Sequence, residues 1–381
     1  MTPFSPQELR RLLGRPVRAI VGPEEREALA GRRVLVTGAG GSIGGALARE
    51  LAACGVATLG LVDHSEHALF VIEREIRDRW PRLDLEIGLV DVTRGAAIRR
   101  ACERVRPFAV YHAAAYKHVT MAERAPAAAA NVNVLGTVET AMATADAGAR
   151  FLLISSDKAA DPTSVMGATK RLSELAIRCV GGIRFRPLVV RFGNVLGSSG
   201  SVLEIMRACV RAGRPIPLTD PDATRYFMTA GEAVALVLRA DRLGRAAEIC
   251  WLEMGRPVRM GDLAARVIDI ERAAGYDAVP IEVIGLRPGE KRNETLEDAQ
   301  LRFERSLDRR ILVARDTGPG ADAVMPAIAR LRRVVARADD AGALDVLAST
   351  VAGFAPSEAA AAVARQTLRP AGDVRRRQRV A

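Results

Sequence analysis

The fold is decided by residues 33–44, which read Arg33-Val34-Leu35-Val36-Thr37-Gly38-Ala39-Gly40-Gly41-Ser42-Ile43-Gly44. The apolar run Arg33–Val36 predicts a short buried strand, and Ser42–Ala53 predicts a helix with one apolar face. A glycine-rich turn between strand and helix presents helix amides and a helix dipole to a diphosphate. We therefore expect a dinucleotide site formed by Thr37, Gly38, Gly41, Ser42, Ile43 and Gly44.

Outward from this segment, apolar strands alternate with helical stretches. The further strands are expected at Thr58–Val62, Leu85–Val90, Ala109–His112, Phe151–Ile154 and Leu188–Arg191. Near-continuous apolar strands separated by helices indicate a parallel sheet covered on both faces, so we expect a Rossmann-like, doubly wound α/β fold with a smaller C-terminal α/β lobe.

The same pattern suggests how the chain is divided. We expect a helical lead-in over 1–30, with a helix at 5–13, and a dinucleotide-binding domain over 31–195. Residues 196–315 would form mainly a substrate-binding lobe, which could be interleaved with the main sheet. Residues 316–381 would form a C-terminal helical extension and a basic tail.

Acidic residues follow the second and third predicted strands. Asp63 lies about 20 residues beyond the glycines, where an acid accepts hydrogen bonds from the adenosine ribose. A carboxylate there repels a 2′-phosphate, which favours NAD over NADP. Asp91 and Val92 are placed to meet the adenine, although Asp91 could equally cap a helix.

A polar triplet, Ser156-Asp157-Lys158, follows the fifth predicted strand. Open α/β sheets bind ligands beyond the carboxyl ends of their strands, so these side chains should face the cleft. Two interpretations compete: an acid–base constellation, or a structural ion pair between neighbours. We favour the first, because adjacent residues rarely pair well.

The glycine spacing resembles the extended short-chain dehydrogenase/reductase family, and the resemblance continues at His112–Ala115 and Asn133–Thr137. It implies that Ala113 and Ala114 let the backbone pass beneath the cofactor and that Lys170 binds the nicotinamide ribose. That family usually carries Tyr four residues before the Lys, and Met166 stands there instead. An inactive nucleotide-binding protein is therefore one alternative.

Further motifs, spanning about three quarters of the chain, resemble one subgroup, the UDP-N-acetylglucosamine 4,6-dehydratases of polysaccharide and glycan biosynthesis. They are 114–119 (AAYKHV), 156–159 (SDKA), 165–170 (VMGATK), 191–198 (RFGNVLGS), 224–229 (TRYFMT) and 287–291 (RPGEK). Part of this subgroup has Met in place of Tyr. Many relatives carry N-terminal membrane helices, and this chain resembles their freestanding catalytic part.

The subgroup resemblance also implies roles for the cleft residues. Ser156 would hydrogen-bond the C4 oxygen of the sugar, Asp157, kept protonated, would protonate the C6 oxygen, and Lys158 would remove the C5 proton. Burial and Lys170 would lower the pKa of Lys158. The acceptor of the C4 hydroxyl proton stays open among Lys158, Ser156 and a water.

Substrate contacts are implied in the same way. Lys117 would touch the substrate, Asn194, Arg225 and Arg287 would hold the diphosphate, and Glu290 would accept from the uridine ribose. Ser199 and Arg292-Asn293 differ from the residues usual in this subgroup, which leaves the exact UDP-sugar open. The stereochemistry at C5 and the pathway are open as well. A UDP-sugar epimerase is a second alternative.

Composition excludes several classes. The 381 residues are 49% hydrophobic, contain no run long enough to span a membrane, and begin with a polar segment, which favours a cytoplasmic protein. The five dispersed cysteines predict neither a disulfide frame nor a zinc site, and no metal is expected. The net charge of +11 could attract nucleic acid or lipid, but with 4% aromatics we expect no nucleic-acid partner. Weak membrane-surface contact through the tail at 375–379 and a homo-oligomer remain expectations.

Overall fold

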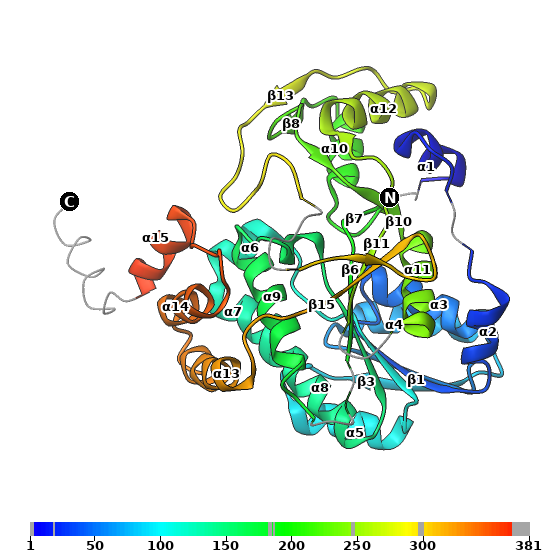
Figure 1. Ribbon diagram of the computed structural model, residues 1–381. Helices are drawn as coiled ribbons and strands as arrows, with labels where there is room; N and C mark the ends of the chain where they lie inside the picture. The colour runs from blue at the N-terminus through cyan, green and yellow to red at the C-terminus, as the bar shows by residue number, and fades with distance from the viewer. Residues whose placement is uncertain are drawn as a thin grey trace, which may run out of the picture.

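A nine-stranded sheet forms the centre of the computed structural model (Figure 1), which describes residues 4–17, 20–181, 185, 187–244, 248–295 and 301–367. The basic tail at 375–379 lies outside the described residues. The sheet order is β14-β15-β11-β6-β5-β4-β1-β2-β3. The bounds are β1 (Arg33–Thr37), β2 (Thr58–Asp63), β3 (Asp84–Leu89), β4 (Ala109–His112), β5 (Arg150–Ile154), β6 (Leu188–Arg191), β11 (Glu248–Leu252), β14 (Glu304–Arg305) and β15 (Ile311–Arg315).

Seven of these strands are parallel, as the alternating pattern predicts. The run from β3 through β11 pairs in parallel throughout, which confirms the doubly wound fold. The edge differs from the expectation, because β15 pairs antiparallel with β11, and β14 antiparallel with β15. Strands β11 and β15, from the region expected to form mainly the lobe, thus complete the main sheet.

Helices cover both faces of the sheet. One face carries α2 (Pro23–Leu29), α3 (Ser42–Ala53), α4 (Glu66–Arg79) and α11 (Ala230–Leu243). The other carries α5 (Gly95–Val105), α6 (Val119–Arg124), α7 (Pro126–Ala130), the π-helix η1 (Asn131–Leu135), α8 (Gly136–Asp146) and α9 (Val165–Ile177). Each face has its own apolar core, so the sheet is buried on both sides.

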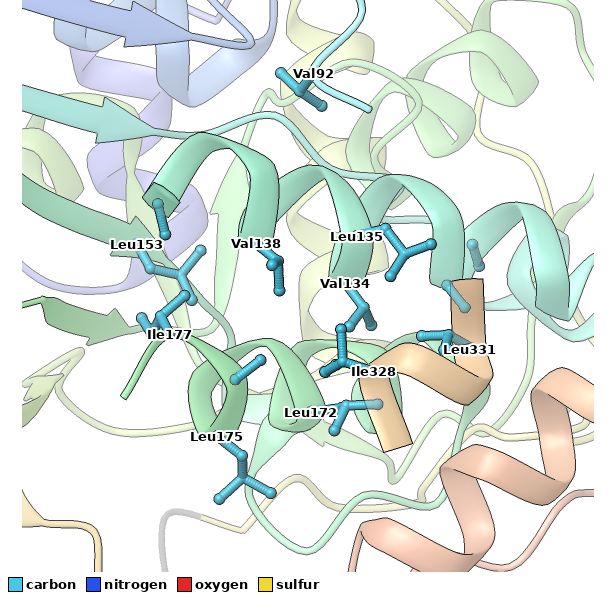
Figure 2. Packing of buried hydrophobic residues seen from close by; sticks show 14 of the residues in the cluster. Val92, Val134, Leu135, Val138, Leu153, Leu172, Leu175, Ile177, Ile328 and Leu331 are labelled. Carbon is cyan, nitrogen blue, oxygen red and sulfur yellow. The ribbon is translucent and has the colours of Figure 1, made fainter. Parts of the chain in front are cut away.

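The C-terminal helices form an additional layer on the second face. They are α13 (Ala321–Val335), α14 (Asp340–Thr350) and α15 (Glu358–Thr367), and they pack against α6, α7 and α9 (Figure 1). Figure 2 shows Val134 of η1, Leu172 of α9 and Ile328 of α13 meeting in one cluster. The extension therefore belongs to the core that supports α9. Among the residues that the model describes, no helix is long and apolar enough to cross a bilayer.

A smaller lobe has a third apolar core above the carboxyl ends of the parallel strands. Its elements are α10 (Val202–Arg211), α12 (Met260–Ala273) and the short strands β7 (Asn194–Leu196), β8 (Ile216–Leu218), β9 (Thr224–Arg225), β10 (Phe227–Thr229), β12 (Val258–Arg259) and β13 (Ile281–Val283). The leading helix α1 (Pro6–Leu13) lies beside α12 (Figure 1), burying Leu12 and Leu13 in this core. Its Ser5–Glu8 capping box confirms the predicted helix start.

A buried carboxylate joins the main sheet to α9. Glu174 accepts hydrogen bonds from Ser155 Oγ at 2.6 Å, from Arg191 Nη2 at 2.6 Å and from Arg171 Nη1 at 3.2 Å. Arg171 also binds Asp316, just after β15, at 2.6 Å and 3.0 Å. The Glu174 and Arg191 side chains are fully buried. These bonds connect the ends of β5, β6 and β15 to one turn of α9.

Replacing Glu174→Gln should lower the free energy of unfolding by about 3–5 kcal/mol, because it removes the buried negative charge that Arg171 and Arg191 share. Urea denaturation followed by circular dichroism measures the change. The matched control is Glu75→Gln, since Glu75 also holds an arginine, Arg49, by two bonds but at the exposed surface. That variant should change stability by at most about 1 kcal/mol. Equal small losses in both variants would contradict a central role for Glu174.

Candidate active site

The glycine turn between β1 and α3 has the geometry of a phosphate cradle. Gly38 has φ +67°, and a Cβ there would lie 2.6 Å from the Ala114 nitrogen. A Cβ on Gly44 would lie 2.0 Å from the Gly38 oxygen, so helix and turn pack without space for a side chain. Gly41 is the N-cap of α3 and has no side chain to occupy the first-turn amides. The turn thus leaves these amides available to an anion.

Both predicted acids are bound to backbone amides. The Asp63 carboxylate accepts from Gly40 N and from Ser65 N, each at 2.9 Å, and is 7% exposed. It therefore lies directly beside the glycine turn. Asp91 accepts from the backbone and hydroxyl of Thr93, whereas α5 begins only at Gly95. Asp91 stabilises a turn and remains exposed, and Val92 is buried in the core.

A buried hydrogen-bonded chain lies beneath this turn. His112 contacts Thr37 Oγ1 at 2.7 Å through Nδ1 and Thr137 Oγ1 at 3.0 Å through Nε2. Thr137 donates onward to the Asn133 carbonyl, so Nε2 carries the imidazole proton and Nδ1 accepts from Thr37. Burial, with a contribution from Lys170, lowers the pKa of His112 to about 3. The Thr37 hydroxyl is therefore buried and bonded to His112 within the core.

One large cavity of about 820 Å³ lies at the carboxyl ends of the strands, between the sheet and the lobe. It gathers residues that the sequence analysis singled out from distant segments. Its lining includes Gly41, Ser42, Ile43, Gly44, Ala113, Lys117, Ser156, Lys158, Met166, Lys170, Asn194, Arg225, Arg287 and Glu290. Asp157 lies behind this lining. A smaller cavity of about 150 Å³ adjoins it, sharing Lys158, Asn194, Arg225 and Glu290.

The Ser156-Asp157-Lys158 triplet forms a short helical turn, η2 (Asp157–Ala159), after β5. Asp157 is buried, and its Oδ1 accepts from Ser156 Oγ at 2.8 Å and from Lys158 Nζ at 3.0 Å. Its Oδ2 is buried and has no hydrogen-bond partner among the described residues. The expectation that adjacent residues do not pair is therefore wrong, because the tight turn brings both side chains together.

The electrostatic expectation for Lys158 is also wrong. Burial alone would lower the pKa of its amine, but Asp157 and Glu294 outweigh burial and raise that pKa above its usual value. Glu294 Oε1 lies 3.5 Å from Lys158 Nζ. In the free protein, Lys158 is therefore an ammonium ion between two carboxylates.

Helix α9 presents Met166 and Lys170 to the cavity, and both are largely buried. Lys170 Nζ donates to the Ile154 carbonyl at 2.9 Å. Burial lowers the pKa of this amine to about 8, and Glu174 opposes the shift. Met166 offers no proton donor at the position next to the triplet, so proton transfer there must use other groups.

The expected substrate residues approach the cavity from several segments. Asn194 donates to the Tyr226 carbonyl at 3.3 Å, and Glu290 accepts from Arg287 N at 3.2 Å within the 287–291 turn. The Arg225 guanidinium donates to the carbonyls of Arg292 at 2.7 Å and Lys291 at 2.6 Å. Arg225 thus fixes the 287–292 loop, whereas Arg287 is exposed.

Sequence reasoning missed Glu294 at this site and gave no individual role to Asn133. Glu294 is 9% exposed and reaches Lys158 from beyond the 287–291 motif. Asn133, fully buried, binds both the nitrogen and oxygen of Tyr116, at 2.7 Å and 3.0 Å, and so fixes the loop that carries Lys117. The sequence signal for Asn133 is its place in the 133–137 motif, whereas the π-helix that holds it has no sequence signature.

Comparisons with known proteins agree with this arrangement. The family model described as "Polysaccharide biosynthesis protein" matches residues 34–315. The chain is similar to the probable polysaccharide biosynthesis protein EpsC of Bacillus subtilis, with 41% identity over 290 residues, 75% of this chain and 48% of EpsC. It is 39% identical over 294 residues to the capsular polysaccharide biosynthesis protein CapD of Staphylococcus aureus, covering 76% and 49%. The chain thus spans about half the length of these relatives.

Other similar proteins carry out related sugar chemistry. UDP-glucose 4-epimerases from Rickettsia species are 30% to 33% identical to the chain. Among solved structures, DesIV, the dTDP-glucose 4,6-dehydratase of Streptomyces venezuelae with NAD and TYD bound, has a TM-score of 0.63 and 22% identity, covering 70% of this chain and 88% of that one. At that identity the likeness shows the fold alone.

The buried His112 should make stability depend on pH. Its folded pKa of about 3 lies below the unfolded value of about 6.5, so between these values the unfolded chain binds the extra proton and stability falls as pH falls. Between pH 7 and pH 5 this group should cost about 2 kcal/mol. Urea denaturation at both pH values should show that loss in the wild type beyond the loss in His112→Gln, which keeps a donor and an acceptor but does not titrate. Equal losses would mean that His112 is protonated in the folded protein.

Proposed function

Since this chain belongs to the polysaccharide biosynthesis protein family, within the extended short-chain dehydrogenase/reductases, we propose that it is a nucleotide-sugar 4,6-dehydratase. Its substrate would be UDP-N-acetylglucosamine or a close UDP-N-acetylhexosamine, and its 4-keto-6-deoxy product would supply deoxy amino sugars for polysaccharide or glycan synthesis. The observation that carries the proposal is that Ser156 and Lys158 line the cavity, as Lys170 does, and that both bind the buried Asp157 behind them.

The cofactor of this proposal is NAD. The cradle fits a diphosphate, because Gly38 and Gly44 leave no space for side chains and the first-turn amides of α3 face the cavity. Asp63, beside the turn, favours an unmodified ribose over a 2′-phosphate. DesIV, a fold neighbour, carries NAD. When bound, NAD would accept a hydride from the sugar C4 and return it at C6, with Lys170 holding the ribose next to it.

In the proposed mechanism the Ser156–Asp157 hydrogen bond replaces the missing tyrosine. Asp157 receives the C4 hydroxyl proton through Ser156: the serine oxygen takes the sugar proton while its own proton passes to Oδ1, 2.8 Å away. This leaves Asp157 protonated at the moment an acid is needed. Oxidation at C4 makes the C5 hydrogen acidic.

Lys158 and Asp157 then act in sequence. Lys158, once its ammonium proton has passed to solvent, removes the C5 proton, and Asp157 gives its proton to the C6 hydroxyl, which leaves as water. Lys158 then returns a proton to C5 and regains its own from solvent, while C6 would receive the hydride from the bound cofactor. The two protons taken from C4–OH and C5 balance the two given to the leaving water and to C5. The reaction is redox-neutral overall.

Two alternatives make different demands on the site. An epimerase needs no acid at C6, so the Asp157–Lys158 pair argues against it, although UDP-glucose 4-epimerases are relatives. An inactive binding protein agrees with Met166, but it would not require an ammonium held by two buried carboxylates.

The first test is incubation of the purified protein with UDP-N-acetylglucosamine in heavy water without added cofactor. We expect loss of one water, a new C6 methyl group and deuterium at C5, measured by mass spectrometry and proton NMR. A 4-epimer without loss of water would establish the epimerase instead. If no UDP-N-acetylhexosamine is changed although NAD is bound, the proposed function is wrong.

Variants of the triplet separate the proposed steps. Lys158→Met should stop C5 exchange but still allow C4 oxidation, so that adding substrate produces the absorbance of reduced nicotinamide. Asp157→Asn should abolish that absorbance, because it removes the acceptor of the C4 proton. Both variants should lose at least about 10²-fold in turnover. Full turnover in Lys158→Met would contradict its role as the base.

A further inference from the structure

The second carboxylate on Lys158 has no role in the steps above. Glu294 lies after the 287–291 motif, and its side chain is 5% exposed. Its Oε1 is 3.5 Å from Lys158 Nζ and 3.9 Å from Arg225 Nε. Arg225 directs its terminal nitrogens to the carbonyls of Thr224, Lys291 and Arg292. Lys158 is therefore the nearer cation to the Glu294 carboxylate.

We propose that Glu294 is the positioning residue of Lys158: together with Asp157 its carboxylate holds the amine as a cation in the free enzyme, and it sets the pH at which Lys158 can serve as a base. The ion contact itself stands on geometry, and only the role as base rests on the proposed function.

The charges around Lys158 explain why Glu294 carries this role. Asp157 of η2 and Glu294 attract the ammonium, Arg225 of β9 opposes it, and Glu290 and Lys291 line the same small cavity. Once Asp157 has taken up the C4 proton, its charge is gone, and Glu294 is the carboxylate left in contact with the amine. The protonation of Lys158 during the reaction then depends on Glu294.

Lysine is scarce in this chain and is concentrated at the cleft. Only four of the 56 basic Lys and Arg residues are lysines, namely Lys117, Lys158, Lys170 and Lys291. All four line the two adjoining cavities. Away from the cleft, the described ion pairs of basic side chains with carboxylates are formed mainly by arginine, which stays charged. The cleft contains lysines, whose amines can lose a proton. A carboxylate that controls this proton is a functional part of the cleft.

The four lysines also allow a direct test that needs no turnover. Protein labelled with ¹³C at lysine Cε gives four NMR signals, assigned with Lys→Arg variants. Relative to the wild type, Glu294→Gln should move the titration midpoint of Lys158 down by about 1–3 pH units, because one opposite charge is lost. Glu294→Asp keeps the charge on a shorter side chain and should give a smaller shift. This variant also keeps the test valid should Glu294→Gln fold poorly.

Asp161→Asn provides the matched control. Asp161 is an exposed carboxylate that contacts Lys291, at 3.7 Å, instead of Lys158. Its replacement should leave the Lys158 midpoint unchanged. If Glu294→Gln also leaves that midpoint unchanged, the inference is overturned.

The rate of C5 deuterium exchange against pH gives the second readout. The rising limb of this profile should move to lower pH in Glu294→Gln, whereas a merely structural role would lower the rate at every pH. If the wild type shows no turnover but Glu294→Gln still shifts the NMR midpoint of Lys158, the proposed function is overturned and the Glu294 inference stands. If the wild type turns over but Glu294→Gln shifts neither the NMR midpoint nor the pH profile, the proposed function stands and the Glu294 inference is overturned.

Discussion

The structure depends on a single buried carboxylate, Glu174, because it fixes the catalytic wall of the cleft from behind. It binds Ser155 at the end of β5 and Arg191 on β6, while Arg171 links it to Asp316 beyond β15. A buried ion network of this kind is costly to desolvate and tolerates little displacement, so it specifies geometry more than it adds stability. The proposed catalytic residues begin one position after Ser155, so their placement follows from this network. The C-terminal extension also supports this wall, because Asp316 accepts from Arg171 and α13 packs on α9.

The neighbours of each amine, more than its burial, distinguish the two lysines of the cleft. Burial lowers the pKa of Lys170, whose donor is satisfied by the Ile154 carbonyl. Lys158 is less buried than Lys170 is, yet two carboxylates raise its pKa. One amine is therefore easily neutralised and the other is held as a cation. The same residue type acquires opposite electrostatic properties within one cavity.

Features that depend on local residues, such as the alternation of strands and helices and the conformation of the glycine turn, can be predicted from the sequence. The parallel strands, the cradle at Gly38 and the Ser5 helix start were all predictable for this reason. What could not be predicted depends on contacts between distant segments. Glu294 meets Lys158 through the path of the 287–294 loop, and the reversed direction of the edge strand β15 depends on its pairing with β11. The error in the charge state of Lys158 has two origins: its pairing with the adjacent Asp157 was discounted, and the distant Glu294 was not recognised.

The absence of a tyrosine at Met166 need not reduce the chemical capacity of the site. A tyrosine in that position would accept one proton and return it to the same oxygen, which suits a reversible oxidation. Elimination instead needs the proton delivered to a different oxygen, at C6. A carboxyl group that takes a proton through Ser156 and holds it in a buried site is suited to that transfer, because Asp157 Oδ2 has no other partner within the described part of the chain. In the proposed reaction the Ser156–Asp157 pair would thus couple the oxidation to the loss of water, whereas a tyrosine would serve the first step alone.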